Sequence, residues 1–182
     1  MKNCYYFTKS SLAFSLFSCI AALVFSGCGS SKDDEDGLLL PEFFIESRGG
    51  VQLSQPTYAT LPISRSQFEV FPAPVIRHNH ITGVAKAKVD LGYCLAFQLN
   101  SRGALRFQGI SADNIGSRLI LMVSRQALGV RVIDGVISNG RIFIFVEYPD
   151  EELDELVAEL TESIIKIQEK EMGSNQDRKN DL

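Results

Sequence analysis

The feature that most constrains the fold is a regular apolar stripe near the C-terminus of this 182-residue chain. Its members recur every three or four residues, between glutamates and lysines, and they are Leu153, Leu156, Val157, Leu160, Ile164 and Ile167. This spacing predicts an amphipathic helix, which is stable only against another apolar surface. Pro149 and Asp150 mark its expected start, and residues 172–175 its expected end. The rest of the chain must therefore supply a surface for this helix to cover.

Upstream of this helix, short apolar runs alternate with turn signals, a pattern typical of β-strands. We expect strands at residues 84–90, 93–99, 119–124, 130–133 and 141–147. Turn signals lie at Leu128-Gly129, Asp134-Gly135 and Asn139-Gly140. The run at 141–147 is apolar at almost every position, which predicts an interior strand covered on both faces.

Between the second and third of these strands the pattern changes to that of a helix. Ser101 is expected to cap it, Phe107 is among its apolar residues, and it should end near Gly116. The order is therefore strand, strand, helix, several strands, helix. This order predicts an α+β fold, a mainly antiparallel sheet with two helices packed on one face.

The main α+β domain is expected at residues 84–171, followed by a polar disordered tail at 172–182. Residues 38–83 are predicted to form an N-terminal extension with short strands. Its candidate strands are 43–45, 68–70 and 74–76. Several prolines keep these strands short or place them at an edge.

The first 27 residues are typical of a signal peptide, with lysines followed by an uncharged apolar run. The run ends in Phe25-Ser26-Gly27-Cys28, which resembles a bacterial lipobox. That resemblance implies cleavage between Gly27 and Cys28 and attachment of acyl chains such as palmitate to Cys28, which would hold the protein on membrane lipid. The alternative is an ordinary secretory signal with a coincidental cysteine. Residues 28–37 are predicted to be a flexible acidic tether.

Two further residues bear on location and on redox chemistry. Gly29 follows the lipobox cysteine, where inner-membrane lipoproteins commonly carry Asp, so we expect the outer membrane, with the inner membrane as the alternative. Cys94 is the only cysteine left in the mature domain, so it has no intrachain partner. Its apolar neighbours predict a small buried side chain rather than a nucleophile.

Charge is segregated along the chain, which has a formal net charge of −4. Residues 38–149 carry a net charge of +4, whereas residues 150–171 carry −7. An acidic protein of this kind is not expected to bind nucleic acid. Six arginines of the basic part could form a patch for lipid headgroups or an acidic partner, and they are Arg102, Arg106, Arg118, Arg125, Arg131 and Arg141. A solvated surface is the simpler expectation for them.

Two sequence blocks follow each other at a characteristic spacing. They are FQLNSRGALRF at 97–107 and DNIGSRL at 113–119, with LGVRVI at 128–133 further on. Together they resemble the head subdomain of the first periplasmic domain of the SecD/SecF protein-export family. The resemblance spans residues 84–165. It implies the fold of a periplasmic interaction domain, and no catalytic residue comes with it.

Chemistry-bearing residues are few. His78 and His80 would share one face of an extended segment and could bind a metal together, with Glu69 or Asp90 as generic further ligands. Asp113 and Asp134 occupy turn positions, where Asp is favoured for local hydrogen bonding. We find no hydrolase, phosphate-loop or dinucleotide motif, and we expect no enzyme activity, no metal and no cofactor.

The sequence therefore predicts a membrane-anchored lipoprotein facing the periplasm. We expect it to act as a non-catalytic binding or assembly module of the cell envelope, associated with protein export and with an envelope protein as partner. The alternatives are a periplasmic metal-dependent enzyme using His78 and His80, or a purely structural envelope lipoprotein. No residue pattern identifies the partner-binding residues or the oligomeric state.

Overall fold

The computed structural model describes residues 37–48 and 57–180, with side chains described as far as residue 173. Its strands are β1 (Pro41–Ile45), β2 (Thr57–Thr60), β3 (Gln67–Val70), β4 (Ile81–Val89), β5 (Gly92–Leu99), β6 (Arg118–Val123), β7 (Gln126–Val132) and β8 (Arg141–Val146). Its helices are the short 3-10 turn η1 (His78–His80), α1 (Ser101–Asp113) and α2 (Leu153–Asn180). The predicted signal peptide, Cys28 and most of the tether lie outside the described residues.

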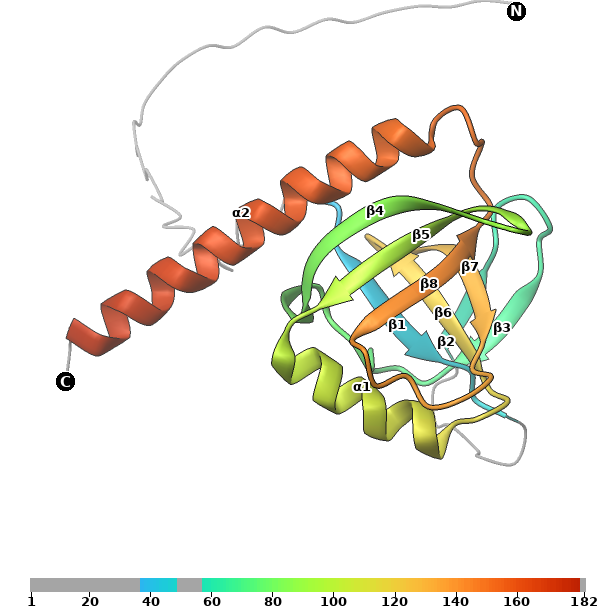
Figure 1. The fold of residues 1–182 in the computed structure, drawn as a ribbon, viewed down its shortest axis with the longest axis horizontal. Helices are drawn as coiled ribbons and strands as arrows, with labels where there is room; N and C mark the ends of the chain where they lie inside the picture. Colours follow the sequence, from blue (N-terminus) through green and yellow to red (C-terminus); the bar gives the residue numbers. More distant parts are fainter. Residues whose placement is uncertain (1–36, 49–56, 181–182) are drawn as a thin grey trace, which may run out of the picture. The chain divides into compact units, whose positions relative to one another are not determined.

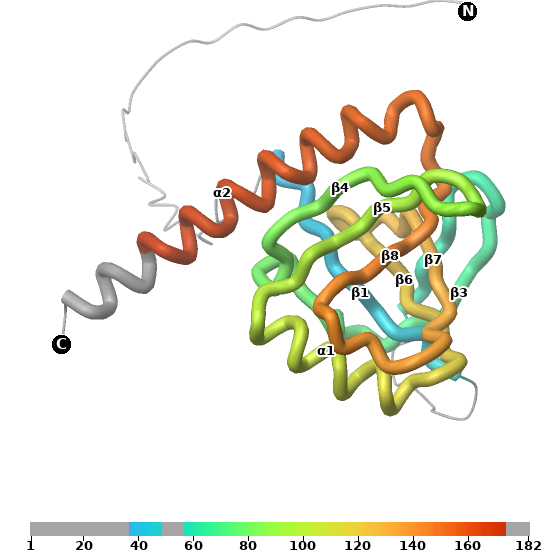
Figure 2. The backbone as a smooth tube through the Cα atoms, in the orientation of Figure 1, coloured from blue at the N-terminus to red at the C-terminus, as the bar shows by residue number. Residues whose placement is uncertain are grey.

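Six strands form one curled sheet in the order β1-β6-β7-β8-β5-β4, and every neighbouring pair is antiparallel. Helix α2 runs along β4 at one side of the curl, and α1 lies near the opposite end (Figure 1 and Figure 2). A second, two-stranded sheet pairs β2 with β3. The predicted α+β fold with a mainly antiparallel sheet is confirmed.

The inner face of the sheet holds the main core, and both helices pack on it. Phe107 of α1 and Leu160 of α2 are fully buried there, together with Phe43 and Phe97, whose rings meet edge to face at a centroid distance of 5.2 Å. Five of the six members of the predicted apolar stripe of α2 are buried, and Val157 is half-buried. Both helices therefore lie on one face, as the order of segments predicted.

The outer face of the same sheet is covered only in part. The β2–β3 hairpin packs on the outer side of β1, β6 and β7, where it buries Phe44, Ile120 and Met122. Because Leu119 and Leu121 of β6 point into the inner core, β6 is covered on both faces, and so is β1 through Phe43 and Phe44. The prediction that β8 would be covered on both faces was wrong, because the hairpin covers the outer face of the sheet only as far as β7.

Helix α1 begins one residue earlier than its predicted cap implied. The side chain of Asn100, not Ser101, accepts a hydrogen bond from the Gly103 backbone N–H at 2.8 Å. Asn and Ser are equivalent caps, so the sequence alone did not separate the two neighbouring residues. After α1, Gly116 adopts a φ of +81°, which glycine tolerates, and the chain turns into β6 as expected.

Helix α2 continues to Asn180, beyond the end predicted at residues 172–175. A single glycine in a helix costs about 1 kcal/mol relative to alanine, which does not end a helix flanked by good helix formers. Among the described residues, no helix combines the length and apolar character needed to cross a bilayer.

The turn predicted at Leu128-Gly129 was also wrong, since both residues lie inside β7. The reversal between β6 and β7 uses Ser124 and Arg125 instead, at φ values of 46° and 72°. A bulge follows, because Leu121 pairs with Gly129 while Met122 pairs with Ala127. Gly129 thus marks a close approach of two strands rather than a turn.

The N-terminal segment is part of the main sheet. Strand β1 begins at Pro41, forms one edge of the sheet and pairs with β6. The strands expected near residues 43–45 and 68–70 are present as β1 and β3. The third, at 74–76, makes only an isolated bridge from Ile76 to Phe43 and is not a strand.

Candidate binding surface

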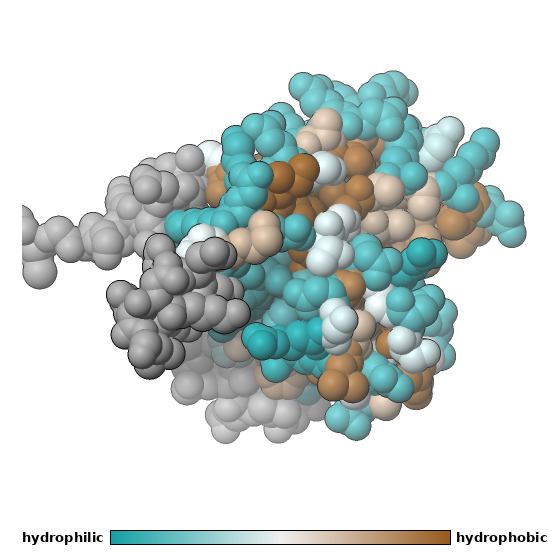
Figure 3. Space-filling view, turned by 60° about the vertical axis from the view of Figure 1, so that its left-hand side comes forward, coloured by the Kyte–Doolittle hydropathy of each residue, from teal (hydrophilic) through white to brown (hydrophobic). Residues whose placement is uncertain are grey.

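The uncovered outer side of β4, β5 and β8, which we call the open face, carries two exposed aromatic side chains. Along β8, Ile142 and Ile144 are fully buried, whereas Phe143 and Phe145 are 37% and 40% exposed. This strict alternation follows from the period of a strand. Figure 3 shows hydrophobic areas open to solvent between hydrophilic ones on one side of the molecule.

Small residues beside Phe143 leave a hollow in the open face. Phe143 pairs across the sheet with Ala96, and Ala96 pairs with Ala85 on β4. With Gly83 on the same strand, these side chains are too short to fill the space next to the phenyl ring. The resulting hollow has a volume of about 390 Å³ and is bordered by Gln98 and Arg141.

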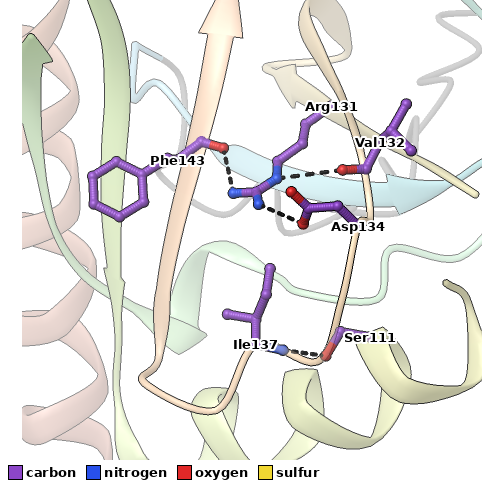
Figure 4. A network of polar contacts seen from close by, with 6 residues as sticks. All are labelled: Ser111, Arg131, Val132, Asp134, Ile137 and Phe143. Atoms are coloured by element: carbon purple, nitrogen blue, oxygen red, sulfur yellow. Dashed lines mark hydrogen bonds and ion pairs between the residues drawn. The ribbon is translucent and has the colours of Figure 1, made fainter. Parts of the chain in front are cut away.

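A second hollow of about 310 Å³ lies on the other side of Arg141 and Phe143. Its far wall is the loop from Asp134 to Asn139, which connects β7 to β8. This loop is tied to α1, because the buried hydroxyl of Ser111 accepts a hydrogen bond from the Ile137 N–H at 2.9 Å (Figure 4). Arg141 and Phe143 therefore stand between an apolar hollow and a more polar one.

The second hollow exists because β7 and β8 separate. Their pairing consists of Gly129 with Val146 and Val130 with Phe145. Beyond that point Arg131 bridges the gap: it donates hydrogen bonds to the Phe143 carbonyl oxygen at 3.1 Å and to Asp134 at 3.0 Å (Figure 4). The hydrogen bond from Arg131 also lowers the pKa of the Asp134 carboxyl.

The same surface contains an ordered arginine, Arg141. Its Nε donates a hydrogen bond to Oε1 of Gln98 at 3.0 Å, and its backbone N–H donates to Oδ1 of Asn139 at 3.0 Å. The Gln98 amide nitrogen in turn donates to the carbonyl oxygens of Leu99 and Gly140, both at 3.2 Å. The arrangement presents a fixed positive charge between the two hollows of the open face.

The six arginines of the candidate basic patch do not form one surface. Arg118 pairs with Glu46 at 2.8 Å, and Arg106 donates to the Val75 carbonyl oxygen at 2.7 Å. Arg125 lies in the β6–β7 turn and Arg102 in the first turn of α1. Arg131 and Arg141 are brought together at the second hollow. The sequence pattern singled out these two arginines, but it did not predict the exposed aromatic side chains beside them.

The histidines are not in the extended segment that the metal hypothesis needed, because residues 78–80 form the turn η1. Nδ1 of His78 lies 3.7 Å from Glu42 Oε1, a distance too long for a hydrogen bond. Neither Glu69 nor Asp90 joins the two histidines, and the described part of the chain contains no group of three or more His, Cys, Asp or Glu residues arranged to hold a metal ion. The two histidines thus contact different groups: His78 lies near Glu42, and His80 accepts a hydrogen bond from the Arg77 N–H.

Of the other candidate groups, Asp134 borders the second hollow, whereas Asp113 and Cys94 line neither hollow. Asp113 is the last residue of α1, while Asp134 is held by Arg131. The Cys94 side chain is 1% exposed, and burial raises the pKa of its thiol. Burial of the uncharged thiol is the environment of an inert cysteine rather than of a nucleophile.

His80 makes stability depend on pH. Burial, followed by the positive charges of Arg106, Arg102 and Arg77, lowers the pKa of His80 from its ordinary 6.5. The folded protein therefore binds this proton more weakly than the unfolded chain, so His80 stabilises the fold above pH 6.5 and this contribution is lost as the pH falls through the lowered pKa.

We therefore expect the free energy of unfolding to fall more between about pH 8 and pH 5.5 in the wild type than in His80→Asn. In the wild type, Nδ1 of His80 accepts a hydrogen bond from the Arg77 backbone N–H at 3.3 Å. An asparagine at position 80 still has an oxygen to accept this hydrogen bond, but its side chain does not titrate. Urea unfolding across this range measures the difference. Parallel curves for the two proteins would contradict the assignment.

Comparison with known proteins supports the fold. No family model and no curated protein matches the chain. Among solved structures, SecDF in its super-membrane-facing form matches with a TM-score of 0.53 and 17% identity, over 69% of this chain and 19% of that one. A structure of SecDF, described as a membrane component that enhances protein export, matches with a TM-score of 0.52 and 18% identity, over 74% of this chain and 70% of that one.

This chain thus spans about one fifth of the first SecDF chain. At identities of 17% and 18%, the likeness concerns the fold. It agrees with the sequence blocks at 97–107 and 113–119, which lie in β5, α1 and β6. The fold of this chain resembles that of a SecD/SecF periplasmic domain, as the sequence predicted.

Proposed function

We propose that this protein is a non-catalytic binding module of the cell envelope that takes part in protein export. In this proposal acyl chains on Cys28 hold it on a membrane, with the outer membrane favoured by Gly29, and the folded domain faces the periplasm. The open face is its binding surface. Partner segments dock against Phe143 and Phe145.

The observation that carries the proposal is the asymmetry of the outer sheet face. One half buries its apolar side chains under the β2–β3 hairpin, and the other half leaves Phe143 and Phe145 in solvent. Contiguous exposed apolar surface on a sheet is a feature of interaction sites. Aromatic side chains are enriched at the centres of such sites, where they provide most of the binding energy.

The link to export is supported by the fold. SecDF, which shares this fold, is described as a component that enhances protein export. A tethered domain of this type can hold a polypeptide segment without chemistry of its own, since binding needs only a complementary surface. The proposal needs neither a metal nor a catalytic carboxylate.

A photo-crosslinking amino acid at position 143 tests the proposal in the native envelope. We expect it to form adducts with a defined partner, and the same amino acid at position 105 to form none. Leu105 is a matched control because it is an apolar residue, 75% exposed, on α1. Equal adducts at both positions, or none at 143, would contradict the open face as the binding surface.

The export role has a separate readout. The double variant Phe143→Thr and Phe145→Thr should raise the fraction of unprocessed secretory precursors in pulse-labelled cells, while Leu105→Ala should not. Thr is favoured in strands, so the fold should tolerate the change. Unchanged precursor levels in the double variant, together with adducts at position 143 in the otherwise wild-type protein, would leave a binding module with no part in export.

The lipid anchor is tested at Cys28. Replacing Cys28 with Ala should abolish labelling with radioactive palmitate and move the protein out of the membrane fraction, because two or three acyl chains provide stable anchoring. A Cys94→Ala variant controls for labelling of any other thiol and should stay labelled. A Cys28→Ala protein that still incorporates palmitate would refute the lipoprotein assignment.

A further inference from the structure

The two arginines at the second hollow have different environments. The guanidinium of Arg131 is bound to Asp134 and to the carbonyl oxygens of Val132 and Phe143, so its charge is paired and three of its five N–H groups are engaged. Arg141 makes one side-chain hydrogen bond, from Nε to Gln98, and forms no ion pair within the part of the chain that the structure describes. Arg141 therefore keeps its charge for a ligand.

Arg141 is also held in place before a ligand arrives. Gln98 is fixed by its two bonds to the carbonyl oxygens of Leu99 and Gly140, which direct its own oxygen to Nε of Arg141. An arginine whose Nε is engaged still offers its terminal N–H groups, in the planar geometry that suits a carboxylate. Because its rotamer is already restricted, binding loses less side-chain entropy.

The two hollows beside Arg141 indicate what else the ligand contains. The one over Gly83, Ala85 and Ala96 is lined by small apolar side chains, which fits a bulky apolar group. The other is bordered by Ser138, Asn139 and the irregular backbone of the loop, which fits hydrogen-bonding groups. An acyl chain has no polar group for the second hollow, whereas a peptide backbone does.

We propose that the open face binds an extended peptide segment that places a carboxylate on Arg141 and a bulky apolar side chain in the hollow over Gly83, Ala85 and Ala96. This inference rests on the proposed function and specifies its ligand. An extended chain puts residues i and i+2 on one side, about 7 Å apart, the spacing that also separates Arg141 from Phe143 along β8. Partners would thus carry an acidic and an aromatic or aliphatic residue at that spacing.

Fluorescence anisotropy with the full chain in mild detergent tests this. The probes are dansylated hexapeptides of sequence Thr-Phe-Thr-Glu-Thr-Thr and Thr-Phe-Thr-Gln-Thr-Thr. We expect the Glu peptide to bind the wild type about tenfold more tightly, as a charge-assisted pair implies, and Arg141→Gln to bind both alike. Arg141→Lys should retain part of the preference, and Arg125→Asn, which removes a distant positive charge, all of it.

Several results would overturn the inference. Equal binding of the two peptides to the wild type would exclude carboxylate recognition, and a preference that survives in Arg141→Gln would exclude this residue. Loss of phosphatidylglycerol vesicle binding in Arg141→Gln, with neither peptide bound, would identify a lipid instead. Circular dichroism confirms that each variant is folded. Crosslinking at position 143 that persists in any of these cases would show that the proposed function stands and that only its ligand was wrong.

Discussion

Replacing Leu160 with alanine is expected to destabilise the domain by about 2 to 5 kcal/mol, the usual cost of truncating a buried leucine. Leu160 is 0% exposed and lies in the middle of the α2 stripe, packed into the inner core. A domain of ordinary stability has only about 5 to 15 kcal/mol in total, so the variant should lose a large part of it. Urea unfolding of the wild type and the variant measures the loss.

The neighbouring residue provides the control. Glu159 is exposed, and Glu159→Gln should change the free energy of unfolding by less than about 0.5 kcal/mol. The other charges of α2 should also contribute little to the free energy of unfolding. Asp154 forms an ion pair with Lys86 at 3.0 Å, but its carboxylate is 77% exposed. Exposed ion pairs contribute at most about 1 kcal/mol. An unchanged melt with lost association in Leu160→Ala would mean that the stripe binds a partner instead of the sheet.

Replacing Gly129 with alanine is expected to cost about 3 kcal/mol or more. A methyl group at this position would overlap the carbonyl oxygen of Phe145 and would lie 3.0 Å from Cγ1 of Val146. Backbone atoms of a central strand cannot move aside without breaking the ladder, so overpacking here is costly. The pairing of Gly129 with Val146 is also one of two residue pairs that join β7 to β8.

Gly135 offers a matched control for this change. It lies in the β7–β8 loop, has no atom within 4 Å of an added methyl group, and does not have a positive φ. Gly135→Ala should therefore leave the melting temperature nearly unchanged, because a compatible Gly→Ala change only restricts the unfolded chain. If Gly129→Ala melted like Gly135→Ala, the close approach of β7 and β8 would be wrong.

The exposure of the open face could not be predicted from the sequence. The apolar run at 141–147 predicts a strand, but an apolar run does not reveal whether both faces of that strand are covered. The run by itself predicts that Phe143 and Phe145 are core residues, but the hairpin covers β1, β6 and β7 and leaves β8 open. Likewise, the sequence does not distinguish Arg131 from Arg141 among the six arginines of the candidate basic patch. Only their neighbours, Asp134 for one and Gln98 for the other, distinguish them.

The sequence by itself determined the local structure: the α2 stripe, the α1 helix around Phe107 and the strands on either side of it. These follow from periodicity and turn chemistry among residues close together in the chain. The tertiary structure alone decided that Phe43 in β1 pairs with Leu121 in β6, and that the β2–β3 hairpin covers only part of the sheet. Periodicity tells which side chains avoid water, but the segment that shields them is chosen by contacts between residues far apart in the chain, and these leave no local pattern.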